Sequence, residues 1–117
     1  MSGGVSGTTI ATVYRSPPRL VLLDNATGTV NGNMPSCADA DDVFFDARRH
    51  RIYVSCGAGA LDEFSRDAAG IRHLDRIQTS AGARTSLYVP ELNEIYVAAR
   101  AGPPGSDAAV LVFRPSP

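Results

Sequence analysis

The sequence predicts an all-β protein, and three observations support this prediction. Short runs rich in Val, Ile, Tyr and Phe follow one another along the 117 residues, and Gly, Pro, Asn or Asp residues bound each run. No window of the sequence sustains the period of an amphipathic helix. The segment HRIYVSCGAG at residues 50–59 returns in related form as NEIYVAARAG at residues 93–102. Such a pattern favours short strands that pair in antiparallel fashion.

We expect about ten strands of roughly five to seven residues, separated by turns. Hydrophobic and β-branched residues suit a pleated, half-buried surface, whereas the Gly, Pro, Asn and Asp residues between the runs favour turns. The segment 60–71 has some helical character, but its place in the repeat described next favours strands. The expected strands are residues 9–15, 19–24, 29–34, 41–46, 51–56, 60–65, 71–79, 84–89, 94–100 and 108–114.

An internal repeat of 42–43 residues organises these strands. Residues 40–54 align without gaps on residues 83–97, and both segments end in the same Ile-Tyr-Val sequence. A repeat of this length with four short strands is typical of the blade of a β-propeller. The sequence therefore predicts a partial β-propeller of about 2.5–3 four-stranded antiparallel blades. The blade pieces are residues 10–34, 41–78 and 84–114.

The predicted blades are too few to close a ring, since closed propellers contain about four to eight. Residues 1–9 are expected to form a flexible lead-in, so the first unit would lack its innermost strand. An open stack leaves sheet faces and strand edges uncovered, and both invite pairing. We therefore expect a fragment of a longer propeller that pairs with its missing blades. The alternative is self-association through the exposed blade faces.

Two segments carry a resemblance to a known family. DDVFFDARRHRIYVSCGAG at residues 41–59 and GARTSLYVPELNEIYVA at residues 82–98 resemble the last blades of YncE-like, YVTN-type β-propellers of the WD40-like superfamily. The resemblance covers about residues 10–115. It implies a bacterial, generally exported propeller, usually of about seven blades, in which the start of the chain often supplies the last outer strand. It implies a scaffold that binds a ligand or a protein, and no catalytic residues carry over.

Charge and hydropathy argue against two classes of partner. The net charge is −1, with 11 basic and 12 acidic residues, so the basic excess that neutralises nucleic-acid phosphates is missing. No apolar run approaches the ~18 residues of a membrane span. Residues 1–15 show no secretory signal, so the chain as it stands is expected in the cytoplasm. A truncated YncE-like protein would instead be periplasmic or secreted. No cofactor is expected.

Four residues are candidates for a ligand site at the channel rim of the expected propeller. Asp41 and Asp42 open the innermost strand of the middle blade, and Arg84 and Thr85 hold the same positions one repeat later. A carboxylate pair at a rim could bind Ca²⁺ or act as a general base. The alternative that we favour is an ion pair between blades, from Asp41 or Asp42 to Arg84, that sets the stagger of the two blades.

Two cysteines, Cys37 and Cys56, lack the spacing of a metal site. If Asp46 and Arg51 flank a hairpin turn, residue 56 pairs with residue 41, and Cys37 lies at the same end of the blade. A disulfide between the two cysteines would then form in an oxidising compartment. Two free thiols are the alternative that we favour.

The segment RRHR at residues 48–51 concentrates positive charge in one turn. Such a cluster could bind phosphate or an acidic partner, but the near-neutral chain favours a solvated turn. His50 and His73 lie at opposite ends of the expected blade, so both are expected on the surface and not in a metal site.

These features favour a non-catalytic β-propeller scaffold that binds a protein or a small ligand. The alternative is part of a metal-dependent propeller hydrolase, similar to a lactonase, in which rim carboxylates hold a divalent cation. Such an enzyme takes ligands from several blades, whereas this sequence places acidic rim residues on one blade only. The scaffold is therefore the favoured hypothesis.

Overall fold

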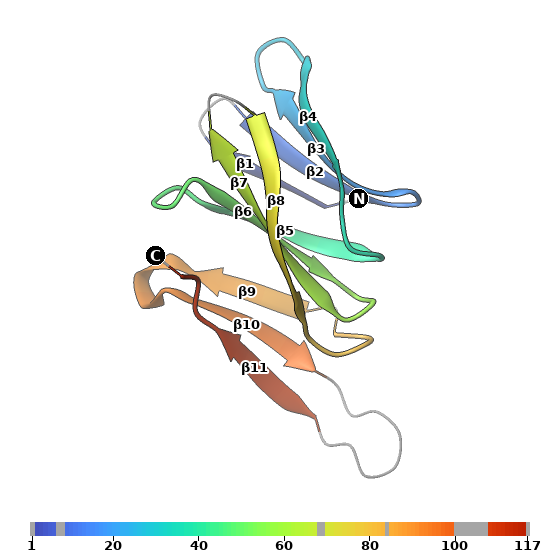
Figure 1. Ribbon diagram of the computed structural model, residues 1–117, viewed down its shortest axis with the longest axis vertical. Coiled ribbons are helices and arrows are strands. Elements are labelled where there is room, and N and C mark those ends of the chain that lie inside the picture. Colours follow the sequence, from blue (N-terminus) through green and yellow to red (C-terminus); the bar gives the residue numbers. More distant parts are fainter. Residues whose placement is uncertain (1, 7–8, 68–69, 84, 100–107, 117) are drawn as a thin grey trace.

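The computed structural model describes residues 2–6, 9–67, 70–83, 85–99 and 108–116, with side chains from residue 9 onward. Eleven strands in this part of the chain form three antiparallel sheets, which confirms the all-β prediction. The sheets follow one another along the chain and stack as three layers along the longest axis of the molecule (Figure 1). No helix among the described residues has the length and apolar character that crossing a membrane requires.

The first sheet has the strand order β1-β2-β3-β4. Its strands are Ser2–Ser6, Thr9–Arg15, Pro18–Asp24 and Val30–Pro35. The flexible lead-in predicted for residues 1–9 is wrong for β1, because this strand pairs with β2 along its whole length. Backbone hydrogen bonds need no apolar side chain, so this glycine-rich segment serves as a strand. The first unit of the repeat therefore has its innermost strand.

The second sheet has the strand order β5-β6-β7-β8. Its strands are Ala40–Asp46, Arg51–Cys56, Ala60–Asp67 and Gly70–Gln78. The segment 60–71 contributes to β7 and β8 and forms no helix among its described residues, as its place in the repeat predicts. Strand β5 bulges at Asp41, so Ala40 lies opposite Cys56 in place of Asp41. A bulge of this kind moves one residue out of the regular pairing.

The third sheet has the strand order β11-β10-β9 among the described residues. Its strands are Thr85–Val89, Glu94–Ala99 and Ala109–Phe113. A short 3-10 helix, η1 at Pro90–Leu92, connects β9 to β10. It ends at Asn93, whose φ of 55° lies in the left-handed region that Asn tolerates better than most residues. The other two sheets have a fourth strand beside the third, whereas β11 has none in the described part of the chain.

Two hydrophobic cores hold the three layers together. The first core lies between the first and second sheets and includes Leu20 and Ile52, both fully buried. The second core lies between the second and third sheets and includes Tyr53 and Ile95. Strand β6 sends alternate side chains into both cores, so every residue from Ile52 to Cys56 is buried.

Strand pairing shows which residues hold equivalent positions in the three sheets. One isoleucine in the second strand of each sheet lies opposite an apolar residue of the third strand. In the second and third sheets this isoleucine faces the preceding sheet, and the next residue along the strand faces the other way. The three isoleucines are Ile10, Ile52 and Ile95. Equivalent residues of different sheets can therefore be compared directly.

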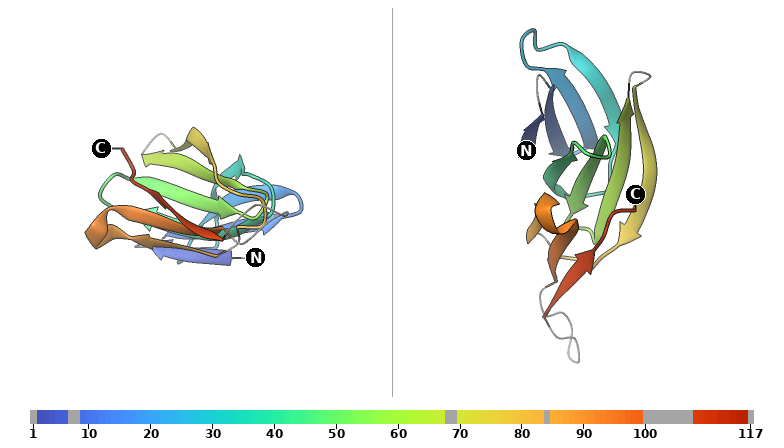
Figure 2. Two further views of the ribbon diagram at one scale, coloured as in Figure 1. Left: turned by 90° about the horizontal axis from the view of Figure 1, so that it is seen from below. Right: turned by 90° about the vertical axis from the view of Figure 1, so that its left-hand side faces the viewer.

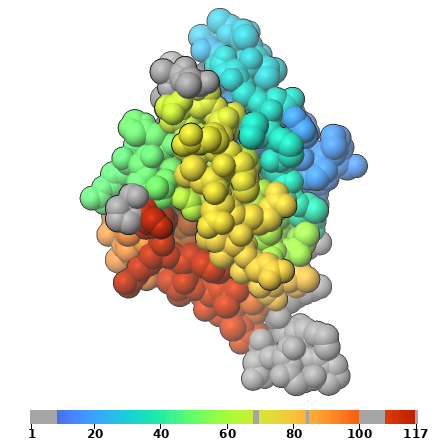
Figure 3. Space-filling model, viewed as in Figure 1, coloured from blue at the N-terminus to red at the C-terminus, as the bar shows by residue number. Residues whose placement is uncertain are grey.

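The innermost and outermost strands lie on opposite edges of the stack. Strands β1, β5 and β9 follow one another along one edge, and β4 and β8 lie side by side along the other (Figure 2). The side chains of β8 form the surface between β4 and β11 (Figure 3). Strand β5 runs from Ala40 to Asp46, so Asp41 and Asp46 mark the two ends of the stack at which candidate sites are found.

Candidate functional site

Asp41 joins the first and second sheets at the start of β5. One of its carboxylate oxygens accepts a hydrogen bond from Arg15 Nη2, and Arg15 Nε lies 3.3 Å from the carboxylate of Asp39. The Asp41 side chain is 8 % exposed, whereas that of Arg15 is 57 % exposed. We favour an ion pair between sheets as the role of Asp41. In the described chain the cation of this pair is Arg15, which belongs to the first sheet.

Asp42 joins the second and third sheets through a hydrogen bond from a hydroxyl group. Ser86 Oγ donates to Asp42 Oδ2 at 3.1 Å, which links the start of β5 to the start of β9. Arg84, the partner that the sequence predicts for the carboxylates, lies outside the described residues. Thr85 is exposed. Three of the four predicted rim residues therefore gather at one end of the stack, and both carboxylates there take part in contacts between sheets.

Cys37 and Cys56 form a disulfide, so the expectation of two free thiols is wrong. Their Cα atoms are 5.9 Å apart, and both residues are buried. Cys37 lies in the connection between β4 and β5, so the bond ties this connection to β6. The bulge at Asp41 leaves Cys56 opposite Ala40, the first residue of β5.

Asp62 is a fully buried carboxylate beside this disulfide, and its partners surround it. The backbone N–H of Cys37 donates to it at 2.7 Å, and Arg76 donates through Nε at 2.6 Å and Nη2 at 3.0 Å. His73 Nε2 lies 3.2 Å from the same carboxylate. The hydrogen bond to Asp62 raises the pKa of Arg76. Because these donors already occupy both oxygen atoms of the Asp62 carboxylate, it is better suited to a structural than to a catalytic role.

Asp46 forms a second buried acidic cluster at the opposite end of β5. Its Oδ2 accepts hydrogen bonds from Tyr53 Oη at 2.6 Å and from Arg49 Nη1 at 3.0 Å. Burial by itself raises the pKa of Asp46, but these hydrogen bonds and the Arg49 charge outweigh it and leave the pKa below its usual value. Burial and the hydrogen bond to Asp46 raise the pKa of Tyr53. The phenol therefore stays protonated and acts as a donor.

The basic turn at residues 48–51 is partly engaged, so the prediction of a simply solvated turn is wrong for two of its arginines. Arg49 Nε and Arg51 Nη1 donate to the backbone oxygen of Ser116 at 3.0 and 2.7 Å. Arg51 Nη1 also lies 2.8 Å from Glu63 Oε1. These contacts fasten the end of the described chain to the second sheet.

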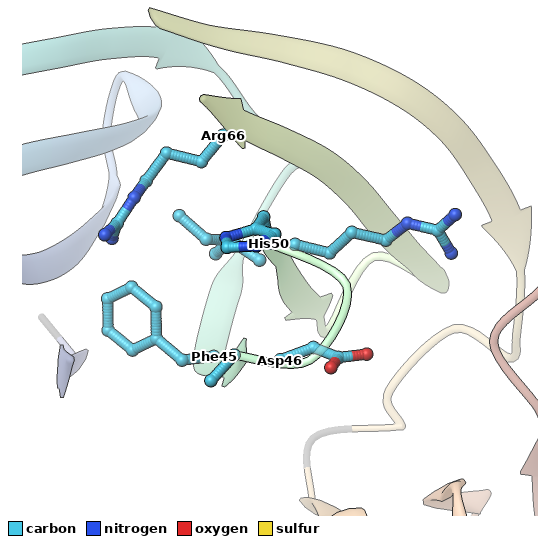
Figure 4. Close-up of a pocket in the computed structure, with 7 residues that line it drawn as sticks. Phe45, Asp46, His50 and Arg66 are labelled. Atoms are coloured by element: carbon cyan, nitrogen blue, oxygen red, sulfur yellow. The ribbon is translucent and has the colours of Figure 1, made fainter. Parts of the chain in front are cut away.

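A hollow of about 240 Å³ opens beside the same turn (Figure 4). Phe45 and Arg66 line it from the face of the second sheet that turns toward the first, and His50 lines it from the turn. The Arg66 guanidinium lies 5.6 Å from the centre of the Phe45 ring. In Figure 4 the Asp46 carboxylate points away from Arg66 and Phe45. The complete lining is Phe45, Asp46, Ala47, His50, Arg51, Ile52 and Arg66.

The described residues contain no group of three or more His, Cys, Asp or Glu side chains that could hold a metal ion. The rim carboxylates of Asp41 and Asp42 belong to separate contacts, one with each neighbouring sheet. His50 and His73 do not meet, since they lie on the β5–β6 turn and on β8.

The outward face of the third sheet, which points away from the second sheet, is apolar and uncovered by described residues. Leu87, Val110 and Val112 are 58, 63 and 49 % exposed. Ala98 is exposed between them, and Tyr96 is half-buried. Pairing of β10 with both neighbours puts these five residues in two adjacent rows across the sheet. We call them the outward face.

The second sheet uses equivalent residues to cover the third. Phe44 and Tyr53 lie one repeat before Leu87 and Tyr96, and both belong to the second core. Leu61 of β7, which holds the position of Val110, is buried in the same core. The sequence carries a signal for this surface that goes beyond the four rim residues, because the repeat alignment marks Leu87 and Tyr96 as contact positions.

Solved structures of longer chains share the stacked-sheet arrangement. A functionally unknown protein from Desulfotomaculum acetoxidans aligns with a TM-score of 0.66 and 11% identity, over 98% of this chain and 42% of its own. A "putative 6-phosphogluconolactonase" from Bacteroides uniformis aligns with a TM-score of 0.68 and 16% identity, over 98% of this chain and 40% of its own. At these identities the likeness shows the fold alone.

The chain therefore spans about two fifths of the length of these solved structures. No family model and no curated protein matches the chain. The resemblance to YncE-like proteins consequently stays a prediction.

Proposed function

We propose that the chain is a non-catalytic binding scaffold of β-propeller type, which docks a further antiparallel sheet on the outward face of its third sheet. When the chain is alone in solution, the docked sheet is the first sheet of a second copy. One observation carries this proposal: Leu87, Tyr96 and Val110 stand where Phe44, Tyr53 and Leu61 of the second sheet cover the third. These three positions of the third sheet form the centre of the expected contact surface.

The first sheet of another copy has a matching face. Ile10 and Leu23 pair with each other across β2 and β3, and both are only half-buried. They hold the positions of Ile95 and Phe113, which the third sheet turns toward the second. A head-to-tail contact would therefore repeat an interface that the chain already makes within itself. Two copies with three sheets each would supply six, within the range of about four to eight for closed propellers.

The energy of docking comes from apolar burial. Each of Leu87, Val110 and Val112 is roughly half exposed, so complete burial contributes on the order of 1 kcal/mol for each. Association itself costs at least about 4 kcal/mol in lost freedom of motion. Three side chains therefore cannot hold two copies together alone, and the contact needs both faces over their whole extent.

Sedimentation velocity over a concentration series tests the proposal with two matched variants. Leu87→Asp places a charge on the outward face, whereas Leu92→Asp changes a side chain of nearly equal exposure, 57 %, on helix η1. We expect the unmodified chain and Leu92→Asp to associate, and Leu87→Asp to dissociate at about tenfold higher concentration or more. An unmodified chain that stays monomeric, or equal behaviour of both variants, would contradict the proposal.

A second candidate function is part of a lactonase-like hydrolase, and the likeness to the "putative 6-phosphogluconolactonase" from Bacteroides uniformis favours it. Asp41 and Asp42 would be the residues nearest to a catalytic centre at the rim. Hydrolysis of 6-phosphogluconolactone, measured with and without added divalent cations, tests this candidate. Activity that Asp42→Asn abolishes, with the fold intact, would replace the scaffold as the proposed function.

A further inference from the structure

The geometry points to a binding site for the phosphate group of a small organic phosphate in the hollow at the β5–β6 turn, with Arg66 as the principal ligand. This hollow lies at the end of β5 opposite the rim residues. None of its lining residues belongs to the outward face of the third sheet. The inference is therefore independent of the docking proposal.

Arg66 is held in place before any ligand arrives. Its backbone N–H donates to the carbonyl oxygen of His50 at 2.8 Å, which joins the end of β7 to the turn. Its guanidinium stacks near the ring of Phe45, and such a contact restrains the long side chain. A guanidinium fixed in this way loses little additional freedom when it binds an oxyanion.

One donor atom of this guanidinium is left without a partner. Nη1 of Arg66 is buried and makes no hydrogen bond with any described residue. A buried donor without an acceptor is unfavourable, and for a charged group the penalty is larger than for a neutral one. Nη1 is closed to solvent, so an oxyanion in the adjoining hollow accepts from it only after a shift of the guanidinium, whose planar fork suits two oxygen atoms of a phosphate.

The local charge favours an anion in the hollow. Asp46 contributes to the lining, but its carboxylate turns away and is occupied by Tyr53 and Arg49 (Figure 4). His50, the last residue of the turn, adds a ring N–H donor, and its backbone φ of 55° lies in the left-handed region. The exposed Arg48 is also part of this turn and raises the positive potential around the opening.

The shape and the apolar wall indicate an organic molecule in addition to the phosphate group. Phe45 and Ala47 offer carbon surface beside the cationic groups. Ligand sites commonly combine an apolar lining with a few placed polar groups. The volume of about 240 Å³ favours a small ligand.

Calorimetric titration at physiological salt tests the site with glycerol 3-phosphate, inorganic phosphate and acetate as probes. We expect glycerol 3-phosphate to bind with a dissociation constant of about 1 mM or below, and acetate to bind at least about tenfold more weakly. Arg66→Gln should weaken the binding of glycerol 3-phosphate by about tenfold or more, because a charged hydrogen bond is lost. Arg66→Lys keeps the charge and should lose part of the affinity.

Arg48→Gln is the matched control, since it removes the same charge from the adjacent β5–β6 turn without changing the lining. It should alter the affinity less than about threefold at this ionic strength. Thermal unfolding of each variant verifies that the fold is kept. Absence of phosphate binding at about 10 mM, equal losses in Arg48→Gln and Arg66→Gln, or acetate binding as tight as glycerol 3-phosphate would overturn the inference.

Discussion

The second and third sheets derive from the same repeat, yet their second strands are buried to different degrees. In β6 every residue from Ile52 to Cys56 is buried, whereas burial alternates along β10 from Ile95 to Ala99. The apolar pattern of the two strands is nearly the same in the sequence, so the difference lies in what covers them. The second sheet has a neighbour on each side, and the described third sheet has one.

The repeat therefore gives both the second and the third sheet two apolar faces, although only the second sheet has a described neighbour on each side. Tyr53 is buried by the third sheet, and its equivalent Tyr96 is half-buried, with its hydroxyl donating to Glu94 at 2.8 Å. An exposed apolar sheet face of this size is a contact surface or an aggregation hazard. Substitutions at equivalent positions of the two sheets measure how far they differ.

The largest difference is expected between two equivalent phenylalanines. Phe64 is fully buried between the first and second sheets, and Phe113 holds its position in the third sheet but is half-buried. In a Leu87→Asp background, which removes association, Phe64→Ala should lower the free energy of unfolding by about 3–5 kcal/mol and Phe113→Ala by clearly less. Urea denaturation measures both, and equal losses would show that the third sheet is already packed like the second.

The disulfide distinguishes the second sheet from the third, where Ala99 holds the position of Cys56. Replacing Cys37 and Cys56 together by Ala opens a loop of 19 residues and should lower the free energy of unfolding by about 3 kcal/mol. Mass spectrometry with and without reduction gives a difference of two hydrogens if the bond is present, and no difference would contradict it.

Asp46 makes the second sheet sensitive to acid, because Val89 takes its place in the third sheet. Since its pKa is lowered in the folded protein, its contribution to stability is complete above the unfolded pKa of about 4. That contribution is lost as the pH falls through the lower folded value. Asp46→Asn should cost about 1–3 kcal/mol at neutral pH and should flatten the acid dependence of the unfolding free energy. An unchanged acid profile would argue against the assignment.

The smallest effect is expected at the contact between the starts of β5 and β9. Ser86→Ala removes the hydroxyl that donates to Asp42 and should cost about 1 kcal/mol. Thr85→Ala, at an exposed neighbouring position, should stay within about 0.5 kcal/mol. Thermal unfolding compares the two variants, and a larger loss for Thr85→Ala would place the contact between these sheets elsewhere.

Much of the fold could be predicted because strand signals and the repeat agree. The runs at residues 41–46 and 51–56 pair as expected, since their apolar residues suit a sheet covered on both faces. The strand at Ser2–Ser6 could not be predicted in the same way. Its sequence SGGVS offers almost no apolar side chain, and its pairing with the neighbouring β2 makes it a strand.

The candidate sites were harder to predict because they depend on register and on distant partners. The sequence left open whether Cys37 and Cys56 form a disulfide, and it did not indicate the bulge at Asp41 that puts Ala40 opposite Cys56. Arg49 meets the backbone of Ser116, 67 residues further along the chain, and such a contact follows only from the stacking of the sheets. Local sequence determines strands, whereas these contacts are determined by the arrangement of the strands in three dimensions.

Photo-cross-linking between associated copies would show whether the third sheet of one copy docks the first sheet of another. A photoactivatable amino acid at Val112 in isotopically labelled chains, mixed with unlabelled chains, reports which residues of a second copy lie on the outward face. We predict links from the labelled to the unlabelled chain at residues around Ile10 and Leu23 of the first sheet. Links only within one chain, or links from one outward face to another, would contradict head-to-tail docking.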